Sequence, residues 1–542
     1  MRARLRGGEG AGGANRGPMR NRRRPLLQVS VPRVHAVLRV LCWALLSVGA
    51  LMLAPAAWAL AAGESGSWQP FAATALITAV VAGVPLRWLR HAPLGRHDAI
   101  VACSLAWVLA TLIAAVPLNA TTGCGYGGAW LEATSGLTTT GLTVYGVPED
   151  LPRATLLWRA EMQLLGGLGI LAFFLLVAFR GSATHRLLAA ESHKHGAGRL
   201  TPGVYGTLVA LWRIYGLLVA AAILLYLLLG MGPFDAVTHG FTAAATGGFT
   251  NYAANMGYYA QSGQPRAALI ELATALVVLV SGINFLVLHR LRRGEWSALW
   301  DGLEMRWYWG LGLGALGLMT VESLVKGGGS LTALTSHLRC QSFAVVSGLS
   351  SAGFVTQPLG GSVSSPDGLT VWPAFYEAGR LALVLLMVVG GCAGSTAGGL
   401  KMVRVALLHR VVQREVRRLS SPPSAVTPLV VDGRLLEDEQ ALRVTSMLFV
   451  WLGVIALAGA VLALTTHLTA WEAATLASSA LGNFGPHFLP QASLAALPPA
   501  AQGTLIATML AGRLEVLPVL VLLAPAAWGR ARRMSRPEGS ET

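Results

Sequence analysis

The sequence predicts an all-α polytopic membrane protein, and three observations carry that prediction. Of its 542 residues, 54% are hydrophobic and only 12% are charged, whereas soluble proteins carry roughly 25% charged residues. Apolar stretches long enough to cross a bilayer, about 20 residues each, recur along the chain. Arginine clusters flank these stretches as the positive-inside rule describes, so the net charge of +16 indicates membrane orientation and not nucleic-acid binding.

The N-terminal segment, residues 1–35, is rich in glycine and arginine and has little apolar content. Such a composition buries too little apolar surface to fold, so we predict a disordered, basic, cytoplasmic tail. The apolar stretch that follows is long enough to span, which argues against a cleaved signal peptide. The five cysteines form no CxxC pair, and we expect packing residues rather than a disulfide or metal framework: Cys42, Cys103, Cys124, Cys340 and Cys392.

Ten spanning helices are expected, at 36–62, 69–89, 98–118, 154–180, 205–230, 266–289, 306–325, 372–408, 441–466 and 502–527. An even number places both termini on one side, and the basic segments between spans place that side in the cytoplasm. The first two spans form an N-terminal unit, residues 36–97. A polar cytoplasmic linker is expected at 413–440, and a short cytoplasmic tail at 529–542.

Four of the outer segments each contain an apolar piece that is too short to cross and that ends in a small-residue turn. They lie at 130–146, 234–250, 342–356 and 471–488. A short helix followed by irregular backbone is typical of a re-entrant loop, which is tolerated at membrane depth only where it is buried in protein or lines a water-filled cavity. We therefore predict four re-entrant loops.

These loops align when Gly141, Gly248, Gly353 and Gly485 are placed in register, at spacings of 107, 105 and 132 residues. Internal repetition of this kind indicates a repeated architecture. The predicted units are four span–loop–span repeats with pseudo-fourfold symmetry around one pore. We refer to them as repeats 1 to 4, at 98–199, 200–304, 305–412 and 441–528.

The loop tips indicate an ion filter made of backbone carbonyls. Carbonyl rings replace the hydration shell of a cation, and glycine readily adopts the positive φ that turns successive carbonyls inward. No loop tip contains a carboxylate, which favours a weakly hydrated monovalent ion such as K⁺ over Mg²⁺. The candidate K⁺-coordinating residues are Thr139, Thr140, Gly141, Thr246, Gly247, Gly248, Ser351, Ala352, Gly353, Asn483, Phe484 and Gly485.

The chain resembles the TrkH/KtrB family of bacterial potassium-uptake subunits, within the superfamily of Trk, Ktr and HKT transporters. The resemblance covers about residues 36–530 and rests on SGLTTTG (135–141), GGLGI (166–170), ATGGFT (245–250), SGINF (281–285), GGCAGSTAGGLK (390–401) and GRLE (512–515). It implies a multi-pass protein of the bacterial cytoplasmic membrane, with K⁺ as the transported ion. It also implies a homodimer on a ring of cytosolic TrkA/KtrA-like regulatory subunits, with nucleotide bound only by the partner and no cofactor in this chain. The two extra N-terminal spans match the TrkH branch.

The ten small residues from 390 to 399 interrupt an apolar stretch that would form one helix about 57 Å long from 372 to 409, at 1.5 Å per residue. We predict that the glycines break this helix beneath the third loop and form an intramembrane gating loop, moved by the cytosolic partner. Its residues are Gly390, Gly391, Cys392, Ala393, Gly394, Ser395, Thr396, Ala397, Gly398 and Gly399. Ala397 stands where the family resemblance leads us to expect glycine.

Charges inside the spans have two interpretations. Arg513 either pairs with Glu515 or a loop carbonyl, or acts, as the resemblance implies, as a cation beside the permeation path. Lys401 is either a gate charge that faces the pore or a snorkelling anchor. We assign three further charges mainly to interhelical pairing: Arg159, Glu161 and Glu271.

Other functions agree less well with the sequence. The glycine-rich stretches lack GK[ST] and follow no soluble strand, and no HExxH is present, which argues against a membrane-embedded enzyme. No span repeats arginine every third residue, as a voltage sensor does. A Na⁺-permeating or Na⁺/H⁺-coupled transporter of the same superfamily stays open. In HKT-type members serine replaces the first filter glycine for Na⁺ selectivity, so Gly141 favours K⁺.

Overall fold

The computed structural model describes residues 34–90, 96–180, 204–326, 331–356, 375–422, 424–486, 488–489 and 494–523. This part of the chain is a bundle of helices with one two-stranded antiparallel sheet, β1 (Val430–Val431) paired with β2 (Arg434–Leu435). The predicted tails at 1–35 and 529–542 lie outside the described residues except for residues 34 and 35.

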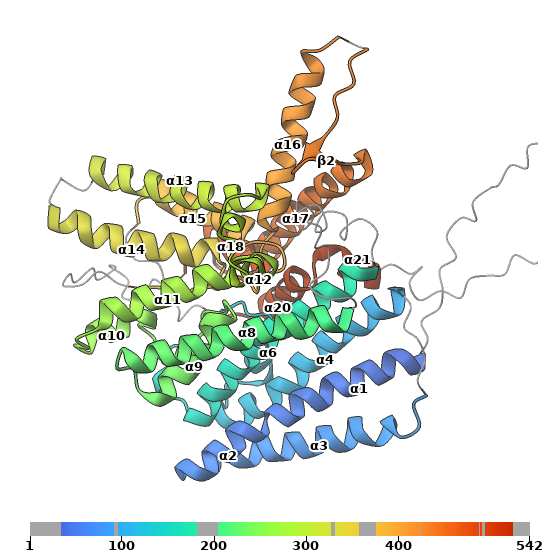
Figure 1. The fold of residues 1–542 in the computed structure, drawn as a ribbon. Helices are drawn as coiled ribbons and strands as arrows, with labels where there is room; N and C mark the ends of the chain where they lie inside the picture. Colours follow the sequence, from blue (N-terminus) through green and yellow to red (C-terminus); the bar gives the residue numbers. More distant parts are fainter. Residues whose placement is uncertain are drawn as a thin grey trace, which may run out of the picture.

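The predicted N-terminal pair of spans lies along one side of the bundle (Figure 1). It consists of α1 (Val34–Leu51), α2 (Leu53–Ala62) and α3 (Trp68–Leu86). Close packing of α1 on α3 depends on Gly49, where an added Cβ would lie 3.1 Å from the Thr78 side chain. These helices pack mainly against repeat 1, and Trp58 of α2 also lies against Phe234 of repeat 2, with ring centroids 5.1 Å apart.

The four repeats follow in order (Figure 1), and in each one a helix of 12, 12, 19 or 13 residues, respectively, ends just before the aligned glycine. Repeat 1 contains α4 (Arg96–Thr122), α5 (Tyr126–Leu137), η1 (Pro148–Asp150) and α6 (Arg153–Arg180). Repeat 2 contains α8 (Val204–Leu228), α9 (Pro233–Ala244), η2 (Asn255–Gly257), α10 (Tyr258–Gln261), α11 (Ala267–Ser281), α12 (Phe285–Arg292) and η3 (Trp296–Leu299). Repeat 3 contains α13 (Leu303–Lys326), α14 (Leu331–Leu349), α15 (Glu377–Val389) and α16 (Met402–Leu419). Repeat 4 contains α17 (Asp438–Thr465), α18 (Ala470–Gly482), α20 (Pro499–Arg513) and α21 (Val516–Leu523).

Among the described residues, six helices are long and apolar enough to cross a membrane, or seven if the bent pair α11 and α12 forms one span. The prediction of a continuous helix at 266–289 is wrong, because the chain turns by 102° between α11 and α12. Asn284 starts α12 by accepting a 2.9 Å bond from the Leu286 N–H, as N-cap residues do. The prediction of a continuous helix at 502–527 is also wrong, because α20 ends at Arg513 and Glu515 has a φ of 60°.

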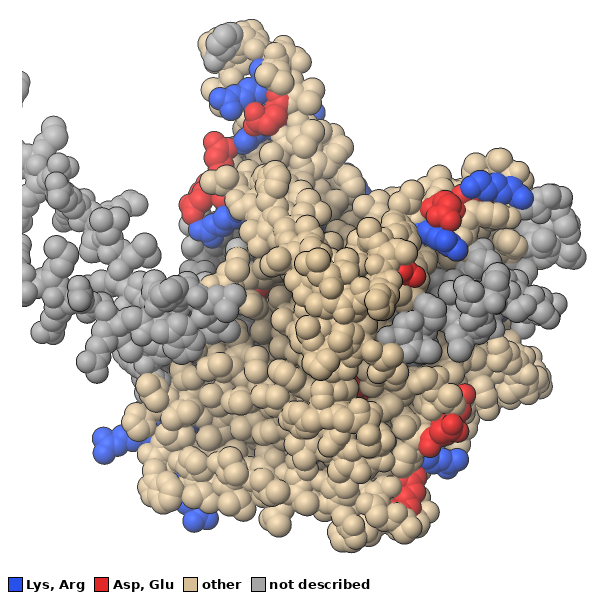
Figure 2. Space-filling view, turned by 180° about the vertical axis from the view of Figure 1, so that it is seen from behind, with Lys and Arg blue, Asp and Glu red and all other residues tan. Residues whose placement is uncertain are grey.

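The arm that projects from the bundle is α16 with the β1–β2 hairpin (Figure 1). The boundary expected between repeat 3 and the linker, at residue 412, falls inside α16. The reason is that residues 410–418 are rich in arginine, which ends an apolar stretch but not a helix, because arginine has a high helix propensity. On the face shown in Figure 2, charged side chains gather on this arm and at the edges, whereas the broad middle carries few of them, as suits a lipid-facing surface.

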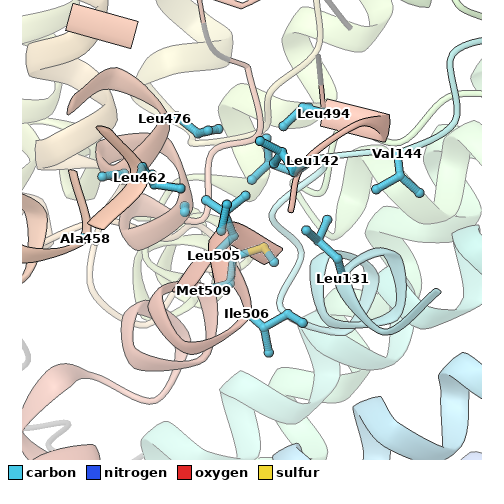
Figure 3. Packing of buried hydrophobic residues seen from close by; sticks show 14 of the residues in the cluster. Leu131, Leu142, Val144, Ala458, Leu462, Leu476, Leu494, Leu505, Ile506 and Met509 are labelled. Carbon is cyan, nitrogen blue, oxygen red and sulfur yellow. The ribbon is translucent and has the colours of Figure 1, made fainter. Parts of the chain in front are cut away.

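A large buried hydrophobic cluster joins the last repeat to the first (Figure 3). Leu476, Leu505 and Met509 of repeat 4 pack with Leu131 and Leu142 of repeat 1, and all five are at most 1% exposed. The two repeats are more than 300 residues apart in the sequence. Their packing therefore closes the four repeats around a centre.

Candidate functional site

The four short helices α5, α9, α14 and α18 end in the same hydrogen-bonded turn. In each, the residue before the aligned glycine donates its N–H to the carbonyl five residues upstream, at 2.8–3.0 Å: Thr140 to Ser135, Gly247 to Thr242, Ala352 to Ser347 and Phe484 to Ser479. This six-to-one bond is the mark of a Schellman helix ending. The last carbonyls of each helix are thereby held in one arrangement, at the helix end that carries partial negative charge.

The backbone after each short helix repeats the same unusual conformation. The residue two before each glycine has a positive φ: Thr139 (52°), Thr246 (50°), Ser351 (47°) and Asn483 (49°). The glycines follow with φ of 86° at Gly141, 80° at Gly248, 76° at Gly353 and 98° at Gly485. Positive φ is unfavourable for a β-branched residue such as threonine, and such strain collects at functional sites. The fourth loop, in which Asn483 and Phe484 replace small residues, shares this backbone.

The four glycines form a closed ring. A Cβ placed on each one would lie only 2.2–2.4 Å from a carbonyl oxygen of the next loop: Gly141 from Gly247, Gly248 from Ala352, Gly353 from Phe484, and Gly485 from Thr140. The contacts run from repeat 1 to 2, 3, 4 and back to 1, which is the pseudo-fourfold order that the sequence predicts. At these positions glycine is required both by backbone conformation and by space.

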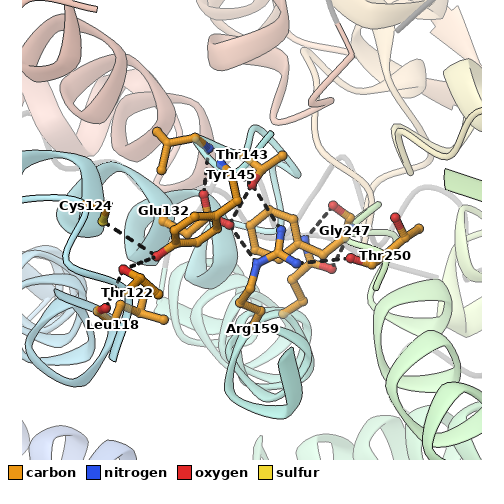
Figure 4. Close-up of polar contacts among 12 residues, drawn as sticks. Leu118, Thr122, Cys124, Glu132, Thr143, Tyr145, Arg159, Gly247 and Thr250 are labelled. Atoms are coloured by element: carbon orange, nitrogen blue, oxygen red, sulfur yellow. Dashed lines mark hydrogen bonds and ion pairs between the residues drawn. The ribbon is translucent and has the colours of Figure 1, made fainter. Parts of the chain in front are cut away.

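A buried ion pair ties the first two loops together (Figure 4). Arg159 of α6 pairs with Glu132 of α5 at 2.8 Å, and the two side chains are 2% and 0% exposed. The same guanidinium donates to the Thr250 carbonyl of the second loop at 3.0 Å, and Glu132 accepts from the Val144 N–H of the first loop at 2.9 Å. The predicted interhelical role of Arg159 is confirmed.

The other two charges assigned to interhelical pairing differ in outcome. Glu271 of α11 pairs with Arg339 of α14 and accepts a 2.6 Å bond from Thr356, so its prediction is confirmed. The prediction for Glu161 is wrong for the described part of the chain, where its buried Oε2 has no hydrogen-bond partner. Arg159, two residues away in the sequence, donates instead to the carboxylate of Glu132 on α5.

Gln163 is a site residue that the sequence reasoning missed. It is fully buried on α6, and its Nε2 donates to the Gly247 carbonyl at 2.6 Å. Its Oε1 accepts from the Phe249 N–H at 3.2 Å. One side-chain amide therefore holds the second loop on both sides of Gly248. No local motif marks this residue, although a glutamine inside an apolar helix is itself a signal of a buried polar contact.

The ten small residues break the helix where the sequence predicts. The helix α15 ends at Val389, Gly390 follows with a φ of 70°, and α16 begins at Met402. Every residue from 390 to 400 is buried. Backbone that leaves a helix at this depth must find partners in the protein. The Cys392 N–H donates to the Gly282 carbonyl at 3.0 Å, and the Gly394 carbonyl accepts from the Phe285 N–H at 3.1 Å.

This loop lies against the ends of three of the four short helices. Thr396 donates to the Ala244 carbonyl of α9 at 3.2 Å, and the Gly398 N–H donates to the Ser351 hydroxyl. A Cβ on Gly398 would lie 2.2 Å from the Gly482 carbonyl of α18. Glu304 of α13 holds the other side of the loop by accepting from the Ala393 N–H at 2.6 Å.

Arg513, at 3% exposure, connects this loop to repeat 1. Its guanidinium donates to the Thr396 carbonyl and to the Gly166 carbonyl, each at 3.0 Å. The expected pair with Glu515 is wrong, because Glu515 bonds Arg404 at 2.8 Å, whereas the expected loop-carbonyl contact is confirmed. The Lys401 ammonium bonds the Ala397 carbonyl and thus turns back toward the loop.

The centre contains backbone carbonyls and hydroxyls rather than metal-ligating side chains. Among the described residues, no three His, Cys, Asp or Glu side chains form a group that could hold a metal ion. The five cysteines are free thiols, of which Cys392 belongs to the buried loop and Cys124 is exposed rather than packed.

Comparison with known proteins agrees with this geometry. The model of a family of cation transport proteins, TrkH, matches residues 68–529. The chain belongs to the TrkH family. It is 32% identical over 511 residues to the Trk system potassium uptake protein TrkH of Halomonas elongata, which covers 91% of this chain and 99% of that protein. The corresponding protein of Escherichia coli K12 is 31% identical over 404 residues, covering 74% of this chain and 79% of that protein.

The fold of TrkH proteins is also the fold of this chain. The crystal structure of the potassium transporter TrkH from Vibrio parahaemolyticus superposes with a TM-score of 0.78 at 28% identity, covering 92% of this chain and all of that one. The resemblance identified from the sequence motifs is therefore confirmed. TrkH is a family of membrane transporters, which agrees with the expectation that the chain is not an enzyme.

Proposed function

We propose that this TrkH-family protein carries K⁺ into the cell through a filter formed by its four glycine-centred loops. The single observation that supports this most directly is the closed ring, in which each glycine lies against a carbonyl oxygen of the next loop. A ring of carbonyls that belongs to four repeats provides a small, uncharged, oxygen-lined passage. Such a passage suits a dehydrated monovalent cation.

The helix ends favour a cation at the same place. Each short helix directs its carbonyl end toward the ring, and a helix C-terminus carries about half a negative charge. Four such ends attract a cation without a carboxylate that would bind it tightly or select a divalent ion. The candidate ligands are the carbonyl and hydroxyl oxygens of residues 139–141, 246–248, 351–353 and 483–485, and the carbonyl oxygens are the ones we expect to matter.

The loop at 390–399 is the gate in this proposal. It fills the space against α9 and α18 and the Ser351 hydroxyl, directly next to three of the four filter loops. An ion leaving the ring in that direction meets this buried segment first. Because α16 begins only two residues after the loop, a force on α16 moves the loop directly.

The surroundings of the protein follow from the same proposal. Both termini lie in the cytoplasm of a bacterium, the helices cross its inner membrane, and a homodimer docks on a cytosolic ring of TrkA/KtrA-like subunits that bind the nucleotide. The α16 arm, which projects from the bundle, is the part of the chain best placed to contact these partners (Figure 1). The chain itself then needs no cofactor.

Growth of a bacterial strain without K⁺-uptake systems tests the proposal. The chain is expressed with a cognate regulatory subunit, and growth at low K⁺ and uptake of Rb⁺ are measured with and without Na⁺. Rescue that is independent of Na⁺ supports uptake of K⁺ alone. Rescue only with Na⁺ supports the alternative, a Na⁺-coupled transporter of the same superfamily. Absence of rescue despite good membrane expression would contradict K⁺ uptake.

A further inference from the structure

A groove of about 700 Å³ lies between α13 and α15. Its walls are apolar, with Leu311, Leu318, Leu381 and Leu385 among the lining residues. Its floor includes Gly310 and Gly314, where an added Cβ would meet no atom within 4 Å. The groove is therefore an open, apolar slot on a helix that is long and apolar enough to cross a membrane.

Two arginines, Arg306 and Arg410, line the same groove. Arg306 uses its Nε for the Trp300 carbonyl at 3.1 Å, and Arg410 uses one terminal nitrogen for Gln413 at 3.0 Å. In the described part of the chain neither forms a salt bridge, and the buried Nε of Arg410 has no hydrogen-bond partner. No acidic residue lines the groove. The groove thus combines apolar walls with two cationic groups that lack an anion.

The end of the groove that holds Arg306 lies near two exposed tryptophans. Arg306 lies in the first turn of α13, next to Trp296 and Trp300, which are 70% and 60% exposed. Exposed tryptophans near the end of a spanning helix mark the membrane interface. Basic pockets between spanning helices at the cytoplasmic interface bind anionic lipid headgroups.

We propose that this groove binds one anionic phospholipid, with its acyl chain along Gly310 and Gly314 and its phosphate between Arg306 and Arg410. The site lies outside the proposed conduction path and does not depend on which ion is carried. It joins α13 to α16, and α16 directly follows the gating loop, so the lipid links the membrane to the part of the chain that moves the loop.

Native mass spectrometry of the full chain in detergent tests this proposal, with phosphatidylglycerol as the probe. We expect the wild-type protein to retain phosphatidylglycerol. The double variant Arg306→Gln, Arg410→Gln should bind it about thirtyfold more weakly, from roughly fivefold for each arginine near a membrane surface. The matched control is Arg417→Gln, Arg418→Gln at the end of α16, which should bind as the wild type does. The proposal would be overturned if both double variants lost phosphatidylglycerol binding equally, or if neither lost it.

A second pair of variants tests the apolar half of the site. Gly314→Phe fills the groove, and Gly317→Phe is its control, because Gly317 lies on the same helix in open space but does not line the groove. We expect only Gly314→Phe to lose phosphatidylglycerol, while soluble glycerol phosphate binds neither wild type nor variant. If Gly314→Phe keeps the lipid and instead changes the protein from dimer to monomer, the groove is an interface between two copies and the lipid proposal is wrong.

Discussion

Arg513 bonds the Thr396 carbonyl and the Gly166 carbonyl with one guanidinium, and so it joins the 390–399 loop to α6 of repeat 1. A planar guanidinium makes two such bonds at fixed geometry, whereas an ammonium acts as a point charge. Arg513 therefore has two separable properties, its charge beside the loop and its tether between two repeats.

The variant Arg513→Ala should increase K⁺ uptake severalfold, because it removes both the charge and the tether. Uptake of Rb⁺ at saturating concentration, normalised to membrane expression, measures the effect. Arg513→Lys separates the two properties, since lysine keeps the charge but not the paired bonds. If Arg513→Lys also transports K⁺ faster than the wild type, the lost paired bonds are responsible for the effect. If it transports at the slow wild-type rate, the charge is responsible. Wild-type kinetics in Arg513→Ala would rule out a role at the pore.

If the 390–399 loop is the gate proposed above, its removal should give a faster transporter that no longer needs a regulatory subunit. The ends of the loop already touch, since the Leu400 and Lys401 N–H groups donate to the Val388 and Val389 carbonyls at 3.0 and 2.9 Å. A deletion between 390 and 399 therefore leaves two helix ends that lie side by side. Uptake is measured with and without the regulatory subunit. Unchanged or reduced flux in a well-folded deletion would remove the gate assignment.

The variant Gly485→Ala should abolish transport, because its Cβ would lie 2.4 Å from the Thr140 carbonyl and the backbone there has a φ of 98°. The control is Gly503→Ala on α20, where a Cβ meets no atom within 4 Å. The control should transport normally, and in a helix alanine is favoured over glycine by about 1 kcal/mol. Uptake and expression are compared for both. Normal uptake by Gly485→Ala would show that the ring is not the filter.

The variant Gln163→Leu should weaken discrimination between K⁺ and Na⁺, because it frees the Gly247 carbonyl and leaves the buried Phe249 N–H without a partner. An unsatisfied buried donor costs about 1–3 kcal/mol, which is enough to rearrange the second loop. The ratio of Rb⁺ to Na⁺ uptake measures selectivity. Gln163→Glu retains the acceptor for Phe249 but not the donor for Gly247, so it isolates the carbonyl contact. Wild-type selectivity in both variants would contradict this role.

The variant Arg159→Leu should lower stability by about 3–5 kcal/mol, because it leaves the buried Glu132 carboxylate unpaired. The double variant Arg159→Leu, Glu132→Leu should recover much of this loss, since no isolated charge remains. Thermal unfolding in detergent is the measurement. The exposed pair Arg443 and Glu439 on α17 is the control, where disruption should cost less than about 1 kcal/mol. Equal losses for the two pairs would contradict a structural role for the buried one.

Local sequence was enough to predict most of the architecture. Apolar stretches predicted six of the ten expected spans as helices that are long and apolar enough to cross a membrane in the described part of the chain, because a bilayer demands apolar length whatever a helix packs against. Aligned glycines predicted the four loops, and the ring confirms their register, including the divergent loop at Asn483 and Phe484. The small residues at 390–399 predicted a broken helix, because glycine disfavours helical backbone at its own position whatever packs around it.

The partners of the buried polar groups depended on tertiary structure. Arg159 binds Glu132, 27 residues away, rather than the nearby Glu161, and Glu515 binds Arg404 rather than Arg513. The bend between α11 and α12, and the clamp of Gln163 on the second loop, likewise need surfaces from other repeats. The sequence by itself determined where the apolar helices lie and where the backbone turns at the aligned glycines and at residues 390–399, since those depend on neighbouring residues. Only the packing of the four repeats decided which buried charged side chains pair with each other. A hydrogen bond depends on positions in space that no local pattern encodes.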